Sequence, residues 1–213
     1  MVKEEEFFCY MEEICNKNQI RLKEEQISKF WTYYKELQRW NRVHNLTAVE
    51  DWKETVKRHF CDSLTLVRFF EDIGYTLEGK CLVDVGSGAG FPGVPLKIYY
   101  PPLEVHLIES ISKKCSFLTY LKTRLGLDYK VHCRLAEEVN LKCHIAVARA
   151  LEVKGKKVDP LVYADKLLTS KAKELVVILK GKELNPLYQK LGYKVYKVPL
   201  EDFKDLKILY KFL

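Results

Sequence analysis

A glycine-rich stretch between a short apolar run and a helical pattern places the strongest constraint on how this chain folds. Residues 83–93 read VDVGSGAGFPG and follow Cys81 and Leu82 directly. This order is typical of a strand-to-helix turn, where glycines let the backbone approach a ligand closely. The helix start beyond the turn presents unpaired N–H groups and a partial positive charge. The sequence therefore predicts a site for a nucleotide-like ligand at this turn.

From about residue 80 onward, short apolar or β-branched runs alternate with helical segments. This alternation is typical of a mostly parallel sheet flanked by helices. The last two runs follow one another closely, which favours an antiparallel hairpin at the edge of the sheet. The predicted strands are 81–85, 104–109, 129–133, 145–148, 175–179, 195–199 and one near 207–210, and the predicted helices between them are 94–99, 112–125 and a segment around 160–168.

The first seventy or so residues show only helical spacing of apolar side chains, as in Phe7, Met11 and Ile14 and later in Phe30, Tyr34 and Leu37. Successive amphipathic helices follow from this pattern. No linker of unusual composition separates them from the strand-rich part. We therefore expect an N-terminal helical extension of residues 1–75, packed on a core domain of residues 76–213.

The 36 basic and 29 acidic residues give a net charge of +7. A positive surplus is compatible with a nucleic-acid partner, because neutralising phosphates gives affinity that does not depend on sequence. It is also an ordinary feature of soluble proteins. Basic residues gather within 53–58, 113–114, 122–124 and 154–157. They would indicate an RNA track if they converge on the mouth of the glycine turn.

Seven cysteines are scattered singly through the chain, without a pair at two-residue spacing. This pattern argues against a zinc knuckle or a disulfide scaffold, and we expect small buried thiols in a reducing compartment. The N-terminal residues lack the apolar core of a signal peptide, and no apolar run approaches bilayer length. The sequence thus predicts a soluble cytoplasmic protein that uses no metal and no membrane.

Two ligand classes compete for the glycine turn, beside a tight turn that holds no ligand. Gly88 to Gly93 match the Gly-x-Gly-x-x-Gly pattern of dinucleotide enzymes, but this register leaves Asp84 without a task. Alternating glycines after an aspartate instead resemble the first motif of class I S-adenosylmethionine-dependent methyltransferases. Glu109 follows about 20 residues later, where an acidic side chain accepts hydrogen bonds from ribose hydroxyls.

Most of the chain resembles the ribosomal RNA small subunit methyltransferase G family, also called glucose-inhibited division protein B. The Pro-Gly-x-Pro continuation of the glycine motif, at residues 92–95, is unusual among methyltransferases. The family's other motifs occur in the right order. They are matched by residues 40–41 (WN), 45–47 (NLT), 58–59 (RH), 62–64 (DSL), 84–96 (DVGSGAGFPGVPL), 134–138 (RLAEE), 148–150 (ARA) and 179–181 (LKG).

The resemblance implies an α/β fold: a class I S-adenosylmethionine-dependent methyltransferase sheet, Rossmann-like, with an N-terminal helical extension. It also implies functional residues by their match to the motifs. The cofactor S-adenosyl-L-methionine would lie against Asp84, Gly86, Gly88, Gly90, Phe91, Glu109, Ala136, Glu137 and Arg149, and the catalytic residues would be Arg149 and Lys180. Within this set Glu109 would hold the ribose, and Ala136 and Glu137 would flank the adenine. Two residues depart from the family pattern: His144 replaces an aspartate behind Arg149, and Phe91 replaces a leucine.

By the same resemblance, the substrate would be guanine N7 in the 530-loop region of 16S ribosomal RNA, in the small ribosomal subunit, and the enzyme would be a monomer. Guanine N7 has no proton to lose. The reaction therefore needs alignment and no general base. Arg149 would contact the guanine edge or the cofactor carboxylate, and Lys180 a phosphate or guanine O6. The alternatives are a methyltransferase of another RNA or of a small molecule, an NAD-dependent oxidoreductase and, last, a non-enzymatic RNA-binding module.

Overall fold

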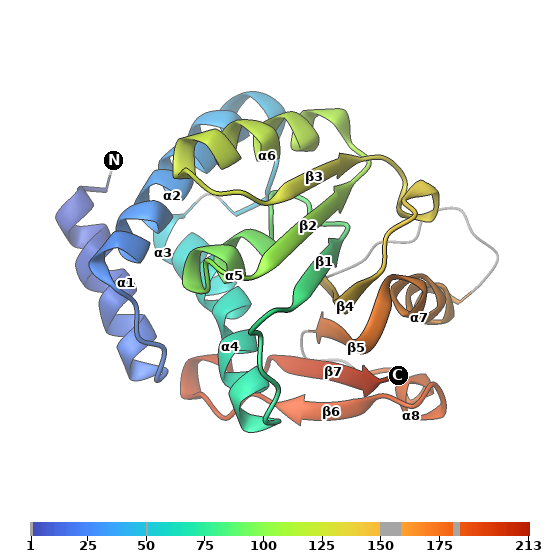
Figure 1. Cartoon of the computed structure of the whole chain (residues 1–213). Coiled ribbons are helices and arrows are strands. Elements are labelled where there is room, and N and C mark those ends of the chain that lie inside the picture. The colour runs from blue at the N-terminus through green and yellow to red at the C-terminus, as the bar shows by residue number, and fades with distance from the viewer. Residues whose placement is uncertain (1, 50, 150–158, 181–183) are drawn as a thin grey trace.

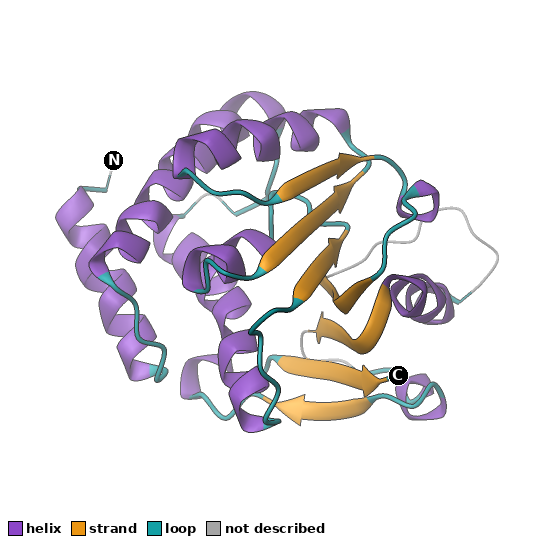
Figure 2. Ribbon diagram, in the orientation of Figure 1, coloured by secondary structure: helices purple, strands orange, loops and turns teal. Residues whose placement is uncertain are grey.

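The computed structural model describes residues 2–49, 51–149, 159–180 and 184–213, which form a seven-stranded sheet with helices on both faces (Figures 1 and 2). The strand order is β3-β2-β1-β4-β5-β7-β6. Strands β1 to β5 run parallel, and β7 is antiparallel to both of its neighbours. The strands are β1 Cys81–Val85, β2 Glu104–Glu109, β3 Lys130–Cys133, β4 Cys143–Arg149, β5 Ala172–Lys180, β6 Lys194–Lys197 and β7 Lys207–Phe212.

The predicted strands all exist, and the terminal hairpin is the antiparallel edge that the sequence favours. β1 and β2 have the predicted bounds. β4 and β5 extend beyond the predicted ranges, and β5 includes the polar residues Lys173 and Glu174. Hydrogen bonds between strands join backbone groups and do not require apolar side chains. The strands β4 and β5 therefore continue beyond their apolar residues.

Eleven helical segments, eight of them α-helices, surround the sheet within the described residues. The helices are α1 Glu4–Lys17, α2 Glu24–His44, α3 Trp52–Thr55, α4 Asp62–Asp72, α5 Gly93–Tyr99, α6 Ser112–Leu125, α7 Pro160–Lys171 and α8 Leu187–Lys190, with a π-helical segment η1 Val56–Cys61 and 3-10 turns η2 Ala136–Glu138 and η3 Glu201–Phe203. Across the described residues, every helix is too short or too polar to cross a membrane.

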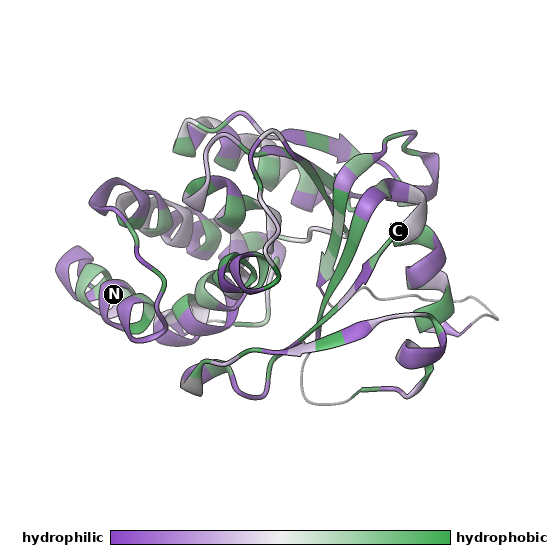
Figure 3. Cartoon of the chain, turned by 60° about the horizontal axis from the view of Figure 1, so that its bottom comes forward, coloured by the Kyte–Doolittle hydropathy of each residue, from purple (hydrophilic) through white to green (hydrophobic). Residues whose placement is uncertain are grey.

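Side chains of alternate residues in the central strands belong to two apolar clusters, one on each face of the sheet. Leu82 and Leu107 belong to the cluster on the side of α1, α2, α4, α5 and α6, whereas Val83 and Ile108 belong to the cluster on the side of α7 and α8. Successive side chains of a strand point to opposite faces, and both faces are covered. The central strands are accordingly mostly hydrophobic, with polar residues such as Asp84 and His106 between the apolar ones (Figure 3).

The N-terminal helices share their apolar cluster with the sheet. Phe7 of α1, Phe30 of α2 and Phe60 of η1 are fully buried in the same cluster as Leu82 of β1. α2 also lies along α6, and α4 along α5 (Figure 1). The helices before β1 therefore complete one face of the core.

Four cysteines differ from the expectation of unpaired thiols. Disulfides join Cys81 to Cys143 and Cys115 to Cys133, with Cα–Cα distances of 5.0 and 5.7 Å. Cys9, Cys15 and Cys61 are free. The expectation was wrong because it rested on spacing along the chain, whereas the first residues of β1 and β4 become neighbours only when these strands pair.

Candidate functional site

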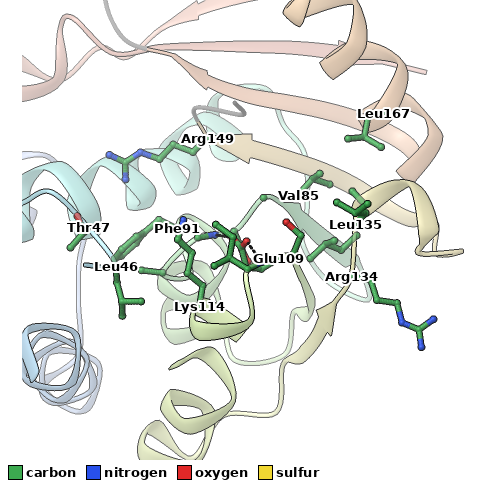
Figure 4. A pocket seen from close by; sticks show the side chains of 18 of the residues that line it. Leu46, Thr47, Val85, Phe91, Glu109, Lys114, Arg134, Leu135, Arg149 and Leu167 are labelled. Atoms are coloured by element: carbon green, nitrogen blue, oxygen red, sulfur yellow. Dashed lines mark hydrogen bonds between the residues drawn. The ribbon is translucent and has the colours of Figure 1, made fainter. Parts of the chain in front are cut away.

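A cavity of about 620 Å³ opens at the carboxyl ends of β1, β2 and β4 (Figure 4). β1 lies between β2 and β4, so the chain order of the sheet reverses here. Open α/β sheets bind their ligands at such a switch point. The turn after β1 forms one wall, the segment around η2 forms another, and residues before η1 close the side near Thr47.

The glycine turn combines an open edge with a tightly packed interior. Gly88 has a φ of +60°, lines the cavity, and has no atom within 4 Å of the place where a Cβ would lie. Gly90 has a φ of +104°, and a Cβ there would lie 2.7 Å from the Tyr33 hydroxyl. Gly88 thus leaves room for a ligand, whereas Gly90 lets the turn pack on α2.

Glu109 ends β2 and supports the turn from below. Its Oε2 accepts a hydrogen bond from the Gly88 amide at 2.8 Å, and its Oε1 accepts one from the Ile111 amide at 2.9 Å. A carboxylate oxygen has two acceptor sites. Glu109 can therefore hold the turn in place and still accept hydrogen bonds from ribose hydroxyls in the cavity that it lines.

Asp84 lies beneath the turn and is not part of the cavity wall. Its Oδ2 accepts a hydrogen bond from the Gly93 amide, the first residue of α5, at 2.8 Å. Burial raises the pKa of this carboxyl to about 7. Its Oδ1 and the buried Ser87 hydroxyl have no hydrogen-bond partner among the described residues. Buried polar atoms are nearly always paired, so the Ser87 hydroxyl, which lines the cavity, fits a place where a bound polar ligand supplies a contact.

Phe91 lines the cavity as predicted and lies in an aromatic stack. Its ring centroid is 5.3 Å from that of Tyr33 and 4.6 Å from that of His59, with interplanar angles of 7° and 18°. The phenyl ring, which stands where the family has leucine, thereby connects the glycine turn to α2 and η1. His59 is held further by Thr47, whose hydroxyl lies 2.9 Å from His59 Nε2.

Arg149, at the end of β4, extends toward the same side of the cavity as Thr47 (Figure 4). Its Nη2 donates to the Arg58 carbonyl and to Asp62 Oδ2, the latter at 3.4 Å, and its Nη1 lies 3.4 Å from His59 Nδ1. All three partners belong to η1 or to the first turn of α4. The family motifs at residues 58–59 and 62–64 thus meet the motif at Arg149 in space.

Burial shifts the protonation equilibria of this cluster. Burial, and then the neighbouring Arg149, lower the pKa of His59 to about 4. Burial raises the pKa of Asp62 to about 6 although Arg149 opposes the rise. At neutral pH the ring of His59 is therefore neutral and Asp62 is charged, so the guanidinium of Arg149 is paired with the Asp62 carboxylate and lies beside an uncharged ring.

The other predicted residues divide between the cavity and its surroundings. Gly86, Ala136 and Glu137 line the cavity, and the Tyr163 hydroxyl donates to Glu137 Oε1. Gly90, Asp84 and Lys180 are absent from the described lining. Lys180 ends β5, one residue beyond the register partner of Arg149. Ala150 and Gly181, which complete two of the motifs, lie outside the described residues.

His144 lies at the start of β4, where its Nδ1 accepts a hydrogen bond from the Cys81 amide at 3.0 Å. It therefore does not stand behind Arg149, which occupies the opposite end of the strand. The expected connection between this departure and Arg149 was wrong.

Several lining residues received no role from the sequence. Lys114 of α6 and Arg134 after β3 bring positive charge to the cavity edge, although the Arg134 guanidinium points away from the other labelled side chains (Figure 4). Thr47 and Tyr163 contribute hydroxyls. Thr47 and Arg134 lie inside family motifs and Lys114 lies in a basic cluster, so the sequence carried a signal for these three, whereas Tyr163 reaches the cavity through the fold alone.

The basic clusters converge on the cavity only in part. Lys114 lines it, whereas Lys57 lies 3.8 Å from Asp202 and Arg124 lies 3.0 Å from Glu36. The cluster at 154–157 lies outside the described residues. Of the clusters within the described residues, the one at 113–114 therefore reaches the cavity, through Lys114.

Solved structures of low sequence identity share this fold. A magnesium protoporphyrin IX methyltransferase from Synechocystis with bound S-adenosylmethionine superposes with a TM-score of 0.60 at 13% identity, covering 90% of this chain and 98% of that one. A 16S rRNA methyltransferase from T. thermophilus in complex with AdoMet and guanosine superposes with a TM-score of 0.56 at 17% identity, covering 70% and 42%. The predicted class I methyltransferase fold is confirmed.

Sequence relatives are more specific. The protein is 46% identical to ribosomal RNA small subunit methyltransferase G of Aquifex aeolicus over 199 residues, which cover 93% of this chain and 97% of the relative. The enzyme of the same name from Acetivibrio thermocellus is 40% identical over 139 residues, which cover 62% and 55%. The family model described as rRNA small subunit methyltransferase G (GidB) matches residues 26–198. With the glycine turn, Glu109 and Arg149 placed around one cavity, these matches show that the chain belongs to the rRNA small subunit methyltransferase G family.

Proposed function

We propose that this protein transfers a methyl group from S-adenosylmethionine to N7 of a guanine in the 16S ribosomal RNA of the small ribosomal subunit. The observation that carries the proposal is the placement of Glu109 and the open Gly88 edge on one wall of the cavity and of Arg149 on another. The family resemblance also supports a monomeric enzyme. The proposed substrate is part of the small ribosomal subunit, which supports a cytoplasmic location.

The residues present fit S-adenosylmethionine. Glu109 has free acceptor sites for the ribose hydroxyls. The apolar side chains of Ile111, Leu135 and Ala136 lie in the same cavity wall and suit a flat base. The Ser87 hydroxyl lines the cavity at the glycine turn and has no hydrogen-bond partner among the described residues, so it can contact a polar group of the cofactor.

When bound, S-adenosylmethionine supplies a methyl group activated by a sulfonium. A bond forms from guanine N7 to the methyl carbon as the carbon–sulfur bond breaks, and no proton moves because N7 carries only a lone pair. The protein's contribution is alignment. Arg149 is suited to it because Asp62, the Arg58 carbonyl and His59 restrict its guanidinium. Neutral His59 adds no positive charge beside a methylated guanine, which is itself cationic.

Arg149→Ala tests the proposal. We expect N7 methylation of small-subunit RNA to fall by about 100-fold or more, as when a positioning group of the transition state is removed, while the variant keeps a cooperative thermal unfolding transition. The measurement is mapping of 7-methylguanosine on naked 16S RNA, on the small subunit and on intact ribosomes. Arg68→Ala is the matched control, since Arg68 pairs with Asp72 on α4 and does not line the cavity. Normal turnover by the Arg149 variant would sink the assignment.

Isothermal titration separates the ligand classes. We expect the protein to bind S-adenosylmethionine and not NAD. A pyrophosphate would need the free amides at the start of α5, but the Gly93 amide already donates its hydrogen bond to Asp84 Oδ2. Binding of S-adenosylmethionine without methylation of any form of 16S RNA would redirect the proposal to another RNA or to a small molecule.

A further inference from the structure

Strands β3, β2, β1 and β4 are neighbours in the sheet (Figure 1). Each carries one residue of a type that commonly binds metal ions, and the strand register places the four on one face. In the strand register, His106 pairs with Val83, two residues after Cys81, and His132 pairs with Ile108, two residues after His106. Residues two apart on a strand share a face. Cys143 belongs to the cluster on that same face. The row therefore reads His132, His106, Cys81, Cys143.

The donor atoms of three of these residues converge. One ligand atom each of Cys81, His106 and Cys143 lies within 4.8 Å of the other two. Cys143 is 1% exposed and His106 is 5% exposed. His132 extends the row, because its Nε2 lies 2.9 Å from His106 Nδ1. The strands thus bring together two sulfurs and an imidazole nitrogen as a set of possible metal ligands. Cys143 and His106 of this set are buried, and Cys81 is half-buried.

The disulfide alone explains the two sulfurs but not the imidazoles beside them. The second disulfide, Cys115–Cys133, offers a comparison, since it belongs to no such group among the described residues. Thiolates with imidazole form the preferred ligand set of zinc. A histidine that binds a metal usually gives its other ring nitrogen to a carboxylate or similar group. Glu104 Oε1 lies 3.1 Å from His106 Nε2 and can serve this role.

We propose that the reduced protein binds a zinc ion through Cys81, Cys143 and His106, with His132 as the nearest donor for the fourth position. Reduction of the disulfide takes two electrons and two protons from two molecules of a cellular thiol, which become a disulfide themselves. The two cysteine thiols then release their protons as zinc binds to the thiolates. The dithiol binds the metal, and the disulfide does not.

This site lies far from the methyl-transfer cavity along the strands. Cys81 and Cys143 begin β1 and β4, whereas Val85 and Arg149 at the other ends of the same strands line the cavity. The zinc ion would therefore join β4 to β1 and β2, and we expect it to raise thermal stability and not to take part in methyl transfer.

The test uses the full chain, purified without oxygen in the presence of a phosphine reductant. Metal analysis after zinc addition and desalting should give about one ion per chain. Titration with Co²⁺ should give a thiolate-to-cobalt charge-transfer band, which reports sulfur ligands directly. Cys81→Ala/Cys143→Ala should lose both signals, and the matched double variant Cys115→Ala/Cys133→Ala should keep them. Glu104→Gln should weaken zinc binding ~10- to 100-fold, as expected for the partner of a ligating histidine.

His106→Asn keeps the sulfurs and removes the imidazole, so it separates a mixed site from adventitious binding to thiols. We expect it to lose the zinc, while circular dichroism checks that it is folded. Reduced wild-type protein that binds no zinc, or equal binding by the Cys81/Cys143 double variant, would overturn the proposal. A disulfide that persists under the reductant, found by thiol counting, would do so too. Methylation of 16S RNA is measured on the same preparations, so failure of the proposed function is seen separately.

Discussion

At the scale of single residues, Arg149 is fixed by groups from a part of the chain about ninety residues earlier. The Arg149 and Asp62 side chains are 23% and 19% exposed and lie 3.4 Å apart. Burial of both charges opposes the gain from their attraction, so such a pair contributes little to stability. The ion pair instead fixes the orientation of the Arg149 guanidinium. The pair therefore serves the geometry of the site.

The pH dependence of stability tests the environment of His59. Its pKa is lowered to about 4 by burial and by Arg149, whereas an unfolded histidine titrates near 6.5. Between these values the folded state binds fewer protons than the unfolded state, so the free energy of unfolding falls as the pH drops from 6.5 to 4. Relative to His59→Gln, the wild-type protein should lose about 2 kcal/mol across this window. Urea unfolding at a series of pH values measures the difference.

His44→Gln is the control, because the His44 ring packs on Trp40 at the end of α2. This variant makes the same chemical change as His59→Gln outside the cluster around Arg149. Asp62 and Asp84, whose pKa values are raised by burial, contribute the opposite slope in all three proteins and cancel in the comparison. Equal slopes for the wild-type protein and the His59 variant would contradict the buried, neutral ring.

From the sequence, the places of the glycine turn and of the last residue of β2 could be predicted better than the contacts that the site residues make. Gly88 and Glu109 could be placed together because both lie at strand ends, and parallel strands bring these ends to one edge. The contacts of Arg149 could not be predicted, because they depend on how η1 crosses the end of β4. Asp84 shows the same limit: its motif predicts a ligand contact, whereas its Oδ2 accepts from the Gly93 amide at the start of α5.

At the scale of elements, the strands and α6 could be predicted closely because apolar runs end at clear stops, such as Gly126, whose φ is +61° after α6. The π-helical segment η1 could not be predicted. Its apolar spacing, with Val56 and Phe60 on one face, is also that of an α-helix. Its extra residue per turn appears only in the backbone, where π-helical turns often mark functional sites. Here η1 presents the Arg58 carbonyl and His59 to Arg149.

Two glycine variants test the turn between β1 and α5. Gly90→Ala places a Cβ 2.7 Å from the Tyr33 hydroxyl and 2.8 Å from Val94, at a φ of +104°. Strain and overpacking together should lower the free energy of unfolding by about 3 kcal/mol or more. Gly88→Ala meets no atom within 4 Å and should lower it by about 1 kcal/mol. It should nevertheless weaken S-adenosylmethionine binding, because the methyl group points into open space at the cavity.

Denaturant unfolding and calorimetric titration distinguish the two effects. Each variant is the control for the other, since both make the same chemical change two residues apart. Equal losses of stability would contradict the packing described for Gly90. Unchanged cofactor affinity of Gly88→Ala would contradict a ligand beside Gly88.

At the scale of the whole molecule, residues 1–75 and 76–213, which the sequence predicted as two parts, contribute side chains to one hydrophobic core. The Gln26 side-chain amide donates to the carbonyls of Ile98 and Tyr99, and the Tyr33 hydroxyl donates to the Ala89 carbonyl. Composition could predict that the first part is helical. It could not show that α2 is buried against the core, since that depends on which faces of α5 and α6 are apolar and face α2.

Removal of residues 1–75 is therefore expected to abolish cooperative folding. Phe7, Phe30 and Phe60 are fully buried, and each contributes about 2 kcal/mol or more by burial, while their loss also exposes the apolar faces of α5 and α6. Residues 76–213 should bind a hydrophobic dye and show no sharp thermal transition. Phe30→Ala in the full chain should cost about 3 to 5 kcal/mol and leave a cooperative transition. A truncated chain that melts cooperatively and binds S-adenosylmethionine would instead make the sheet an independent domain.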